Sequence, residues 1–173
     1  MTASNSSTQV DWEAVYLEYV HRIYNFFRYR MGDDLIAQDL TSLTFEKAWR
    51  SREQYQAELG AVATWLFRIA RNVAVVYFRQ PKPSQVPLDD VYSLAAEDSV
   101  EGEAQRRQDF ARLYALLATL PVREQELVAL KYGAGLTNRA IAKITQLSES
   151  NVGTLLHRTV QKLRAGWELE GAE

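Results

Sequence analysis

The segment 136–153 constrains the fold of this 173-residue chain more than any other part of it. Its apolar residues are spaced as a helix, a tight turn and a second helix, and Ser148 stands where its hydroxyl can cap the second helix. The side chains spaced to close a small core between the two helices are Ile141, Ile144, Leu147, Val152 and Leu156. The second helix carries Arg158, Lys162 and Arg164 on its polar side. A capped, basic helix held at a steep angle to its neighbour is the shape that enters a DNA major groove.

The same segment has a less specific interpretation, in which it is an ordinary pair of packed helices. The small Ala142 and the basic second helix favour the DNA-binding interpretation. In such a unit the first turn reads base edges, so we expect Ser150, Asn151 and Thr154 to do so, while basic side chains contact phosphates. The residues predicted to face DNA are Arg139, Ser148, Ser150, Asn151, Thr154, His157, Arg158 and Lys162.

Composition excludes several other classes of protein. The chain has no Cys, which excludes disulfides, a zinc ribbon and a Cys nucleophile. Its first nine residues lack the features of a secretory signal, and no apolar run reaches the roughly 18 residues that span a bilayer. His21 and His157 are far apart and have no carboxylate at metal-ligand spacing. We therefore expect a cytoplasmic protein that is not an enzyme, does not insert into membranes and has no metal or cofactor.

Charge is segregated along the chain although the net charge is only -2. Residues 46–79 contain six Lys or Arg against three Glu, and residues 137–166 contain five against one. Between these basic blocks, residues 81–105 contain one Lys against six Asp or Glu. A surface that binds nucleic-acid phosphates requires such local concentrations of positive charge.

Helical periodicity covers nearly the whole chain and predicts an all-α fold. In residues 11–31, apolar side chains recur every four positions, and Gly32 then ends that helix. The next helix opens at Asp33 and Asp34. Residues 51–60 are polar and aperiodic, which predicts a loop. Pro121 is placed in the first turn of a later helix.

A further amphipathic helix is predicted for residues 61–79, and the prolines that follow end it. Its apolar stripe is Val62, Trp65, Leu66, Ile69, Val73, Val76 and Tyr77. We predict two small helical domains, 10–80 and 105–168, joined by a flexible acidic linker at 81–104, with the C-terminal domain a helix-turn-helix.

The polar face of helix 61–79 is a second candidate surface for nucleic acid. Arginines beside aromatic rings suit single-stranded DNA, because any base can stack on them. The alternative is a core stripe with a solvated basic face. The residues expected to line this surface are Trp65, Arg68, Arg71, Asn72 and Arg79.

With both blocks in view, the chain resembles the extracytoplasmic-function (ECF) sigma factors of bacterial RNA polymerase, in the sigma-70 family. The N-terminal match consists of Tyr24, Phe26, Ala37 to Leu40, Thr44 to Trp49 and Thr64 to Asn72. The C-terminal match consists of Leu120-Pro121, Arg123, Leu136-Thr137, Ile141-Ala142, Leu147-Ser148 and Leu156 to Arg158. The order and spacing of the two blocks make the resemblance specific.

The resemblance implies a promoter-specificity subunit that binds core RNA polymerase and promoter DNA. The N-terminal domain of the family contacts the beta-prime clamp and melts the minus-ten element. Carried over, the clamp surface comprises Asp39, Leu40, Leu43 and Glu46, and the minus-ten surface comprises Trp65, Arg68, Arg71, Asn72 and Arg79. The loop 51–60 would hold a flipped base. The C-terminal domain would read the minus-thirty-five element and contact the beta flap, and an anti-sigma factor is an expected partner.

The chain also departs from the family pattern. Ser42 and Leu43 replace polar residues of the clamp surface, and Val76 replaces an Asp. In the C-terminal block, Gln146 occupies a turn position usually given to Gly, and Gly153 and Leu155 replace basic residues. Two alternatives stay open: a stand-alone helix-turn-helix regulator, and a helical adaptor that sequesters polymerase or a regulator.

Overall fold

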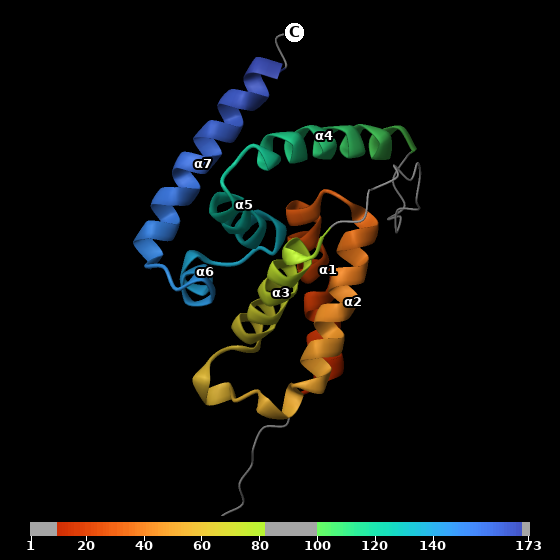
Figure 1. The fold of residues 1–173 in the computed structure, drawn as a ribbon, viewed down its shortest axis with the longest axis vertical. Coiled ribbons are helices and arrows are strands. Elements are labelled where there is room, and N and C mark those ends of the chain that lie inside the picture. The colour runs from red at the N-terminus through yellow and green to blue at the C-terminus, as the bar shows by residue number, and fades with distance from the viewer. Residues whose placement is uncertain (1–9, 82–99, 171–173) are drawn as a thin grey trace, which may run out of the picture.

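A computed structural model describes residues 10–81 and 100–170, and within these ranges the secondary structure is helical without strands, as predicted (Figure 1). The N-terminal helices are α1 (Trp12–Met31), α2 (Asp34–Arg50) and α3 (Val62–Arg79), with two 3-10 turns, η1 (Arg52–Gln54) and η2 (Ala57–Leu59), between α2 and α3. The C-terminal helices are α4 (Val100–Ala118), α5 (Val122–Val128), α6 (Asn138–Thr145) and α7 (Glu149–Glu170), with a π turn, η3 (Ala129–Gly133), after α5. We call α1–α3 the N-terminal block and α4–α7 the C-terminal block. Most of the predicted acidic linker lies outside the described residues.

Local sequence signals set the ends of the N-terminal helices. The Asp11 carboxylate accepts hydrogen bonds from the Glu13 and Ala14 backbone N–H groups and caps α1. Gly32, with φ 68°, ends α1 in the left-handed conformation that glycine adopts without strain. The Asp33 carboxylate then caps α2. These caps explain the sharp turn that lays α2 back against α1.

The buried face of the N-terminal block follows the predicted helical stripes. In α1 the predicted positions Val15, Tyr19, Ile23 and Phe27 are all buried. The stripe predicted for α3 is only partly confirmed: Leu66 and Val73 are buried, Val62, Trp65, Ile69 and Tyr77 are half-buried, and Val76 is exposed. The stripe shifts because α3 contacts both α1 and α2 on one side and α6 on another.

The C-terminal block contains the predicted helix-turn-helix. Thr137 caps α6 through the Ala140 N–H, and Ser148 caps α7 through the Asn151 N–H at 3.1 Å. Gln146 lies between them in the left-handed conformation with φ 60°. Two boundaries differ from prediction: α4 begins at Val100, before the expected start near Gln105, and Pro121 precedes α5 as its N-cap.

The two blocks pack against each other and share a continuous core. In Figure 1, α6 lies beside α3, and α4 crosses the end of the N-terminal block. The Phe110 ring packs edge-on against Tyr29 at 5.6 Å, and Tyr114 packs directly on Gly32. The sequence patterns predicted each block but gave no indication of this contact.

Candidate nucleic-acid interface

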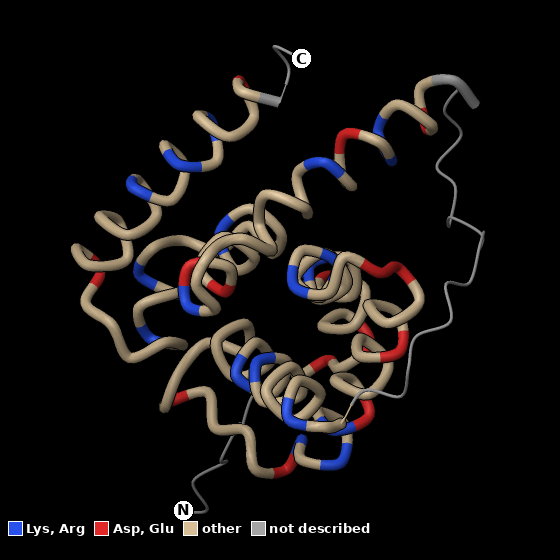
Figure 2. Tube along the Cα trace, turned by 45° about the horizontal axis from the view of Figure 1, so that its top comes forward, with Lys and Arg blue, Asp and Glu red and all other residues tan. Residues whose placement is uncertain are grey.

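The outward face of α7 presents the residues predicted to read DNA. The side chains that the structure exposes there and at the adjoining turn are Ser148, Ser150, Asn151, Thr154, His157, Arg158 and Lys162. The opposite face packs inward through Val152, Leu156 and Thr159, and all three are buried. The helical spacing predicts this burial for Val152 and Leu156 and permits it for Thr159. Figure 2 shows basic positions recurring along α7. The helix thus combines polar groups in its first turns with cations further along, which is the distribution that groove recognition requires.

Two of the predicted phosphate contacts also hold the C-terminal block together. The Lys162 ammonium contacts both carboxylate oxygens of Glu124 in α5 at 3.0 Å. The Arg139 guanidinium, on the exposed side of α6, lies 3.5 Å from the Glu149 carboxylate at the start of α7. Both cations are more than half exposed, so each can also face solvent or a phosphate.

The two departures from the family pattern within α7 fall at half-buried positions. Gly153 is half-buried, and a Cβ at this position would lie 3.5 Å from the Asn138 side-chain nitrogen in α6. Leu155 is also half-buried and packs against the core. A Cβ at 3.5 Å would be an ordinary van der Waals contact, so the structure does not require glycine at position 153. Both positions are half-buried, and the residues predicted to face the groove lie on the exposed sides of the helix.

The polar face of α3 is divided between solvent and the C-terminal block. Asn72 and Arg79 are exposed. Arg68 is also exposed but donates to the Lys143 carbonyl oxygen at 2.9 Å, and the half-buried Arg71 forms an ion pair with Glu126 at 2.7 Å. The five residues predicted to contact single-stranded DNA therefore do not form one open surface, because α6 covers part of it.

Trp65 lies in an aromatic cluster that fastens the 51–60 segment to α1 and α3. Its ring centroid is 5.6 Å from Trp12 and 5.4 Å from Tyr55, and the Tyr55 hydroxyl donates to the Gly60 carbonyl oxygen at 3.0 Å. The predicted loop is thus two short 3-10 turns held by aromatic rings that pack edge-on or tilted against one another. Trp12 and Tyr55 were not identified from the sequence, although their positions beside a helix start and a polar loop are a usable signal.

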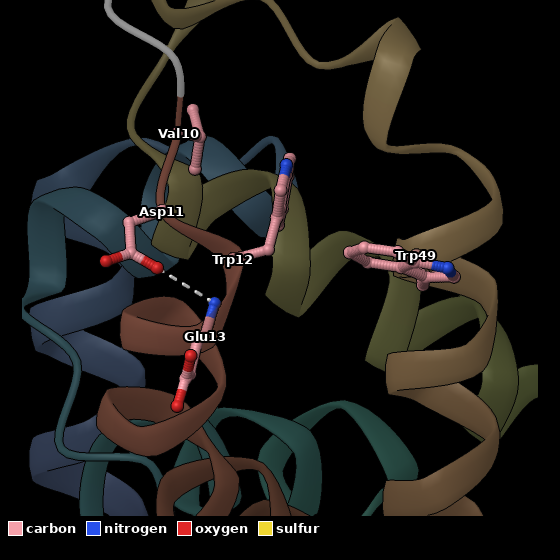
Figure 3. A pocket seen from close by; sticks show the side chains of 5 residues that line it. All are labelled: Val10, Asp11, Trp12, Glu13 and Trp49. Carbon is pink, nitrogen blue, oxygen red and sulfur yellow. Dashed lines mark hydrogen bonds between the residues drawn. The ribbon is translucent and has the colours of Figure 1, made fainter.

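Beside this cluster is an open hollow of about 600 Å³ between the start of α1 and the end of α2. Figure 3 shows Trp12 and Trp49 on opposite sides of it, with Asp11 and Glu13 at its edge. Trp49 is 55% exposed, and the Arg52 guanidinium lies 4.1 Å from its ring centroid. Trp12 is half-buried against Tyr55 and Trp65, so the exposed Trp49 ring with its neighbouring arginine is the accessible stacking surface for a base, which the sequence analysis did not predict.

The predicted polymerase-binding face of α2 is exposed at most of its positions. Asp39, Leu43 and Glu46 face solvent, and Glu46 pairs with Arg50 one turn later at 2.6 Å. The structure instead places Leu40 in the core, at 6% exposure, because it falls on the same helical side as Ala37. Leu40 therefore supports α2 from inside and is not part of the exposed face.

Asp34 organises a polar group at the start of α2. Its carboxylate accepts a hydrogen bond from the Tyr24 hydroxyl at 3.0 Å and pairs with Arg28 at 3.1 Å. Burial, together with the negative charge of Asp34, raises the pKa of Tyr24 to about 12. The neutral phenol is therefore the form that the fold holds at physiological pH.

Two kinds of site are not found in the described ranges, 10–81 and 100–170. These residues contain no group of three or more His, Cys, Asp or Glu that could hold a metal ion. None of the described helices is long and apolar enough to cross a membrane.

Comparison with known proteins gives a family match for each of the two blocks. The family description "Sigma-70 region 2" matches residues 15–82, and "Sigma-70, region 4" matches residues 110–163. The chain is 28% identical over 153 residues to the ECF RNA polymerase sigma factor SigM of Bacillus subtilis, which covers 88% of this chain and 93% of SigM. It is also 28% identical over 151 residues to the ECF sigma factor BldN of Streptomyces coelicolor, covering 86% of this chain and 57% of BldN.

A solved structure shares the fold across both blocks. The sigma factor RpoE, in complex with the anti-sigma factor NepR from Bartonella quintana, matches with a TM-score of 0.70 at 18% identity. The match covers 91% of this chain and 97% of RpoE.

Proposed function

The chain belongs to the extracytoplasmic-function sigma factors of the sigma-70 family, and on this premise we propose that it is a promoter-specificity subunit that binds core RNA polymerase and directs transcription initiation. The observation that carries the proposal is the presence of both regions in one chain, with the capped helix α7 presenting its polar face to solvent. A stand-alone regulator would use α7 but would have no use for the exposed face of α2 that carries Asp39, Leu43 and Glu46. The role is regulatory and non-catalytic, and it is exercised in the cytoplasm, where polymerase works.

In this proposal, α7 enters the major groove at the minus-thirty-five element. Ser150, Asn151 and Thr154 lie in its first turns, where a recognition helix meets base edges, and the Asn amide can bond two atoms of an adenine. His157 and Arg158 lie further along, where the helix runs beside the phosphate backbone. Promoter choice upstream therefore depends on the first turns, while affinity depends on the cations.

Region 2 makes two separate contacts in the same proposal. Asp39, Leu43 and Glu46 of α2 meet the beta-prime clamp. The minus-ten strand follows α3 and the 51–60 segment, where a flipped base is held and neighbouring bases stack on Trp49. The hollow between Trp12 and Trp49 extends this stacking surface beyond the loop.

Two further contacts complete the proposal, one made by the acidic segment with polymerase and one made by the chain with an anti-sigma factor. The acidic segment 81–105 lies in the positively charged channel of polymerase as a mimic of nucleic acid, because its charge is opposite to that of such a channel. An anti-sigma factor binds the chain as a regulator, and the solved complex of RpoE with NepR supports this for a protein of the same fold.

Footprinting of a ternary complex tests the proposal directly. The chain, purified core polymerase and DNA from upstream of its own gene are combined, and DNase I protection and permanganate reactivity of thymines are read on both strands. The proposal predicts protection at two sites roughly two to three helical turns apart, with unpaired thymines at the downstream site. Protection at one site without any unpaired thymine would instead indicate a stand-alone regulator.

A further inference from the structure

The first turn of α7 carries an acidic residue that is not among the residues predicted to face DNA. Residues 137–166 contain five Lys or Arg and one acid, and that acid is Glu149, the first residue of α7. Its side chain is 55% exposed, next to the exposed Ser150 and Asn151. Phosphates repel a carboxylate, so Glu149 weakens DNA binding unless it finds a hydrogen-bond donor in the groove.

Glu149 is paired with a cation from the other helix of the helix-turn-helix. The Arg139 guanidinium, in the first turn of α6, lies 3.5 Å from the Glu149 carboxylate, and the Arg139 side chain is 77% exposed. The starts of the two helices lie close together, since a Cβ on Gly153 would lie 3.5 Å from the Asn138 side-chain nitrogen. The helix-turn-helix therefore presents a donor and an acceptor side by side to solvent.

This ion pair can exchange its mutual contact for contacts with DNA. Water screens a pair of exposed charges, so the pair is weak. The start of α7 does not depend on it, because the Ser148 hydroxyl accepts a hydrogen bond from the Asn151 N–H and caps the helix. A negative charge in the first turn is favourable for α7, but that effect requires no partner in α6.

One base pair has a major-groove edge that matches an arginine beside a glutamate. In a C·G pair, the cytosine N4 amino group donates, and the neighbouring guanine O6 and N7 accept. A carboxylate accepts from cytosine N4, while a guanidinium binds guanine O6 and N7 through two parallel hydrogen bonds. In an A·T pair the adenine N6 donor lies between two separate acceptors, so the guanidinium fork finds no neighbouring pair of acceptors.

We propose that Arg139 and Glu149 together read one C·G base pair of the upstream promoter element, with Glu149 accepting from cytosine N4 and Arg139 donating to guanine O6 and N7. The proposal deepens the promoter-specificity function and rests on it for the identity of the element. It gives Arg139 a part in base reading, in place of the phosphate contact expected from the sequence. The reading itself requires only that α7 enters a major groove.

In this arrangement Glu149 contributes selectivity more than affinity. A carboxylate that faces guanine O6 or thymine O4 places one acceptor against another, and a desolvated acceptor without a donor is unfavourable. Arg139 meets the corresponding mismatch when a donor replaces guanine. An inverted base pair is therefore rejected by both side chains, which is discrimination through repulsion as well as attraction.

Selection from a randomised DNA library tests the reading. Duplexes randomised over about one helical turn, upstream of the minus-ten region mapped by footprinting, are offered to the chain with core polymerase. The same library is offered to the chain alone, and the bound sequences are counted. We expect wild type to favour cytosine at one position roughly tenfold or more, the range of one good base contact.

Variants of Glu149 predict distinct changes at that position. Glutamine binds adenine N6 and N7 through two hydrogen bonds, so Glu149→Gln should change the preference from cytosine to adenine. Glu149→Ala should lose the preference there and keep it elsewhere. Arg139→Ala should weaken the preference at the same position as Glu149→Ala. The matched control is Glu168→Ala, which removes an exposed carboxylate near the end of α7 and should keep the wild-type preferences. Circular dichroism establishes that each variant is folded.

Several outcomes would overturn the reading. One is an unchanged base preference in Glu149→Ala, even with tighter binding to all sequences, because the carboxylate would then act only as a local charge. Uniform weakening in Arg139→Ala would assign that side chain to the phosphate backbone. Absence of any preference for cytosine in wild type, with and without polymerase, would also refute it. If the free chain selects cytosine but the chain with polymerase selects no sequence, the promoter-specificity function fails and the reading of the C·G pair stands.

Discussion

Single side chains fix where the helices of the helix-turn-helix begin and end. Thr137 and Ser148 supply oxygen acceptors to backbone N–H groups that have no helical partner. Between them, Gln146 adopts φ 60°, a conformation in which its Cβ crowds the backbone. The turn therefore keeps its geometry at the expense of local strain, and Ile144 and Val152 on either side of it are both buried in the core.

This strain predicts that Gln146→Gly stabilises the chain. Glycine adopts left-handed φ without crowding, and its greater freedom in the unfolded chain offsets part of the gain, leaving about 1 kcal/mol. Urea unfolding followed by circular dichroism measures the difference. Gln146→Ala is the control, because it keeps the Cβ and should show no such gain. Equal stability of the glycine and alanine variants would contradict the strain argument.

Tyr24 predicts a loss of stability in alkaline solution. Its pKa is raised to about 12 from a usual value of 10, so the folded state favours the neutral phenol. That stabilisation is fully present below pH 10 and is lost as the pH rises from 10 to 12. In Tyr24→Phe, the free energy of unfolding should fall less steeply over this interval. A residual slope is expected, because the pKa values of Tyr19 and Tyr114 are also raised by burial. Identical slopes for both proteins in urea titrations would exclude the effect.

At the scale of elements, the molecule separates its proposed binding functions among helices. The exposed side of α2 carries charges of both signs and apolar side chains, α3 carries arginines beside aromatic rings, and α7 is polar and then basic. Figure 2 shows how the charged positions are distributed along these helices. Each surface lies opposite a buried stripe of the same helix, so one helix supports the core and presents a binding face at once.

For α2, Asp39→Arg should weaken binding to core polymerase at least several-fold, because it reverses a charge on the proposed clamp surface. The position is exposed, so the fold should stay intact. A pull-down with core polymerase measures the affinity. Glu53→Arg is the control for charge reversal alone, since Glu53 is 88% exposed and lies outside α2. Wild-type affinity in the Asp39 variant would remove α2 from the interface.

For α7, the double variant Asn151→Ala with Arg158→Ala should reduce transcription mainly from promoters that have an upstream element. The loss of a base contact and a phosphate contact is expected to cost about 1–3 kcal/mol or more in DNA binding. Glu168→Ala, also exposed but near the end of α7 and outside the predicted DNA-facing residues, should behave as wild type. Equal losses on templates with and without the upstream element would refute the groove assignment.

Helical signals in the sequence predicted most of the elements, because caps and apolar periodicity act within a few residues. Gly32, Ser148 and the stripe of α1 are examples. The contact between the regions was not predictable in the same way. Arg71 and Glu126 are 55 positions apart, and nothing local to either one distinguishes a solvated charge from a paired one. The burial of Leu40 was not predicted, because the resemblance to the family placed this residue on the exposed face without regard to the side of the helix on which it lies.

At the scale of the whole molecule, two weak DNA-binding regions act as one through their linkage. We expect each region alone to have low affinity for DNA, because the net charge of the whole chain is only -2, and we expect its binding to depend steeply on salt. The connection and the polymerase raise the effective concentration of each region at its own promoter element.

Run-off transcription with purified bacterial core polymerase, with and without this chain, on DNA from upstream of its own gene tests the central claim most directly. The account predicts a discrete transcript that requires the chain and starts downstream of the two protected sites. Tight binding to core polymerase with no transcript from any protected fragment would contradict the account and favour an adaptor that sequesters polymerase. Absence of binding to core polymerase would also contradict it and favour a stand-alone regulator.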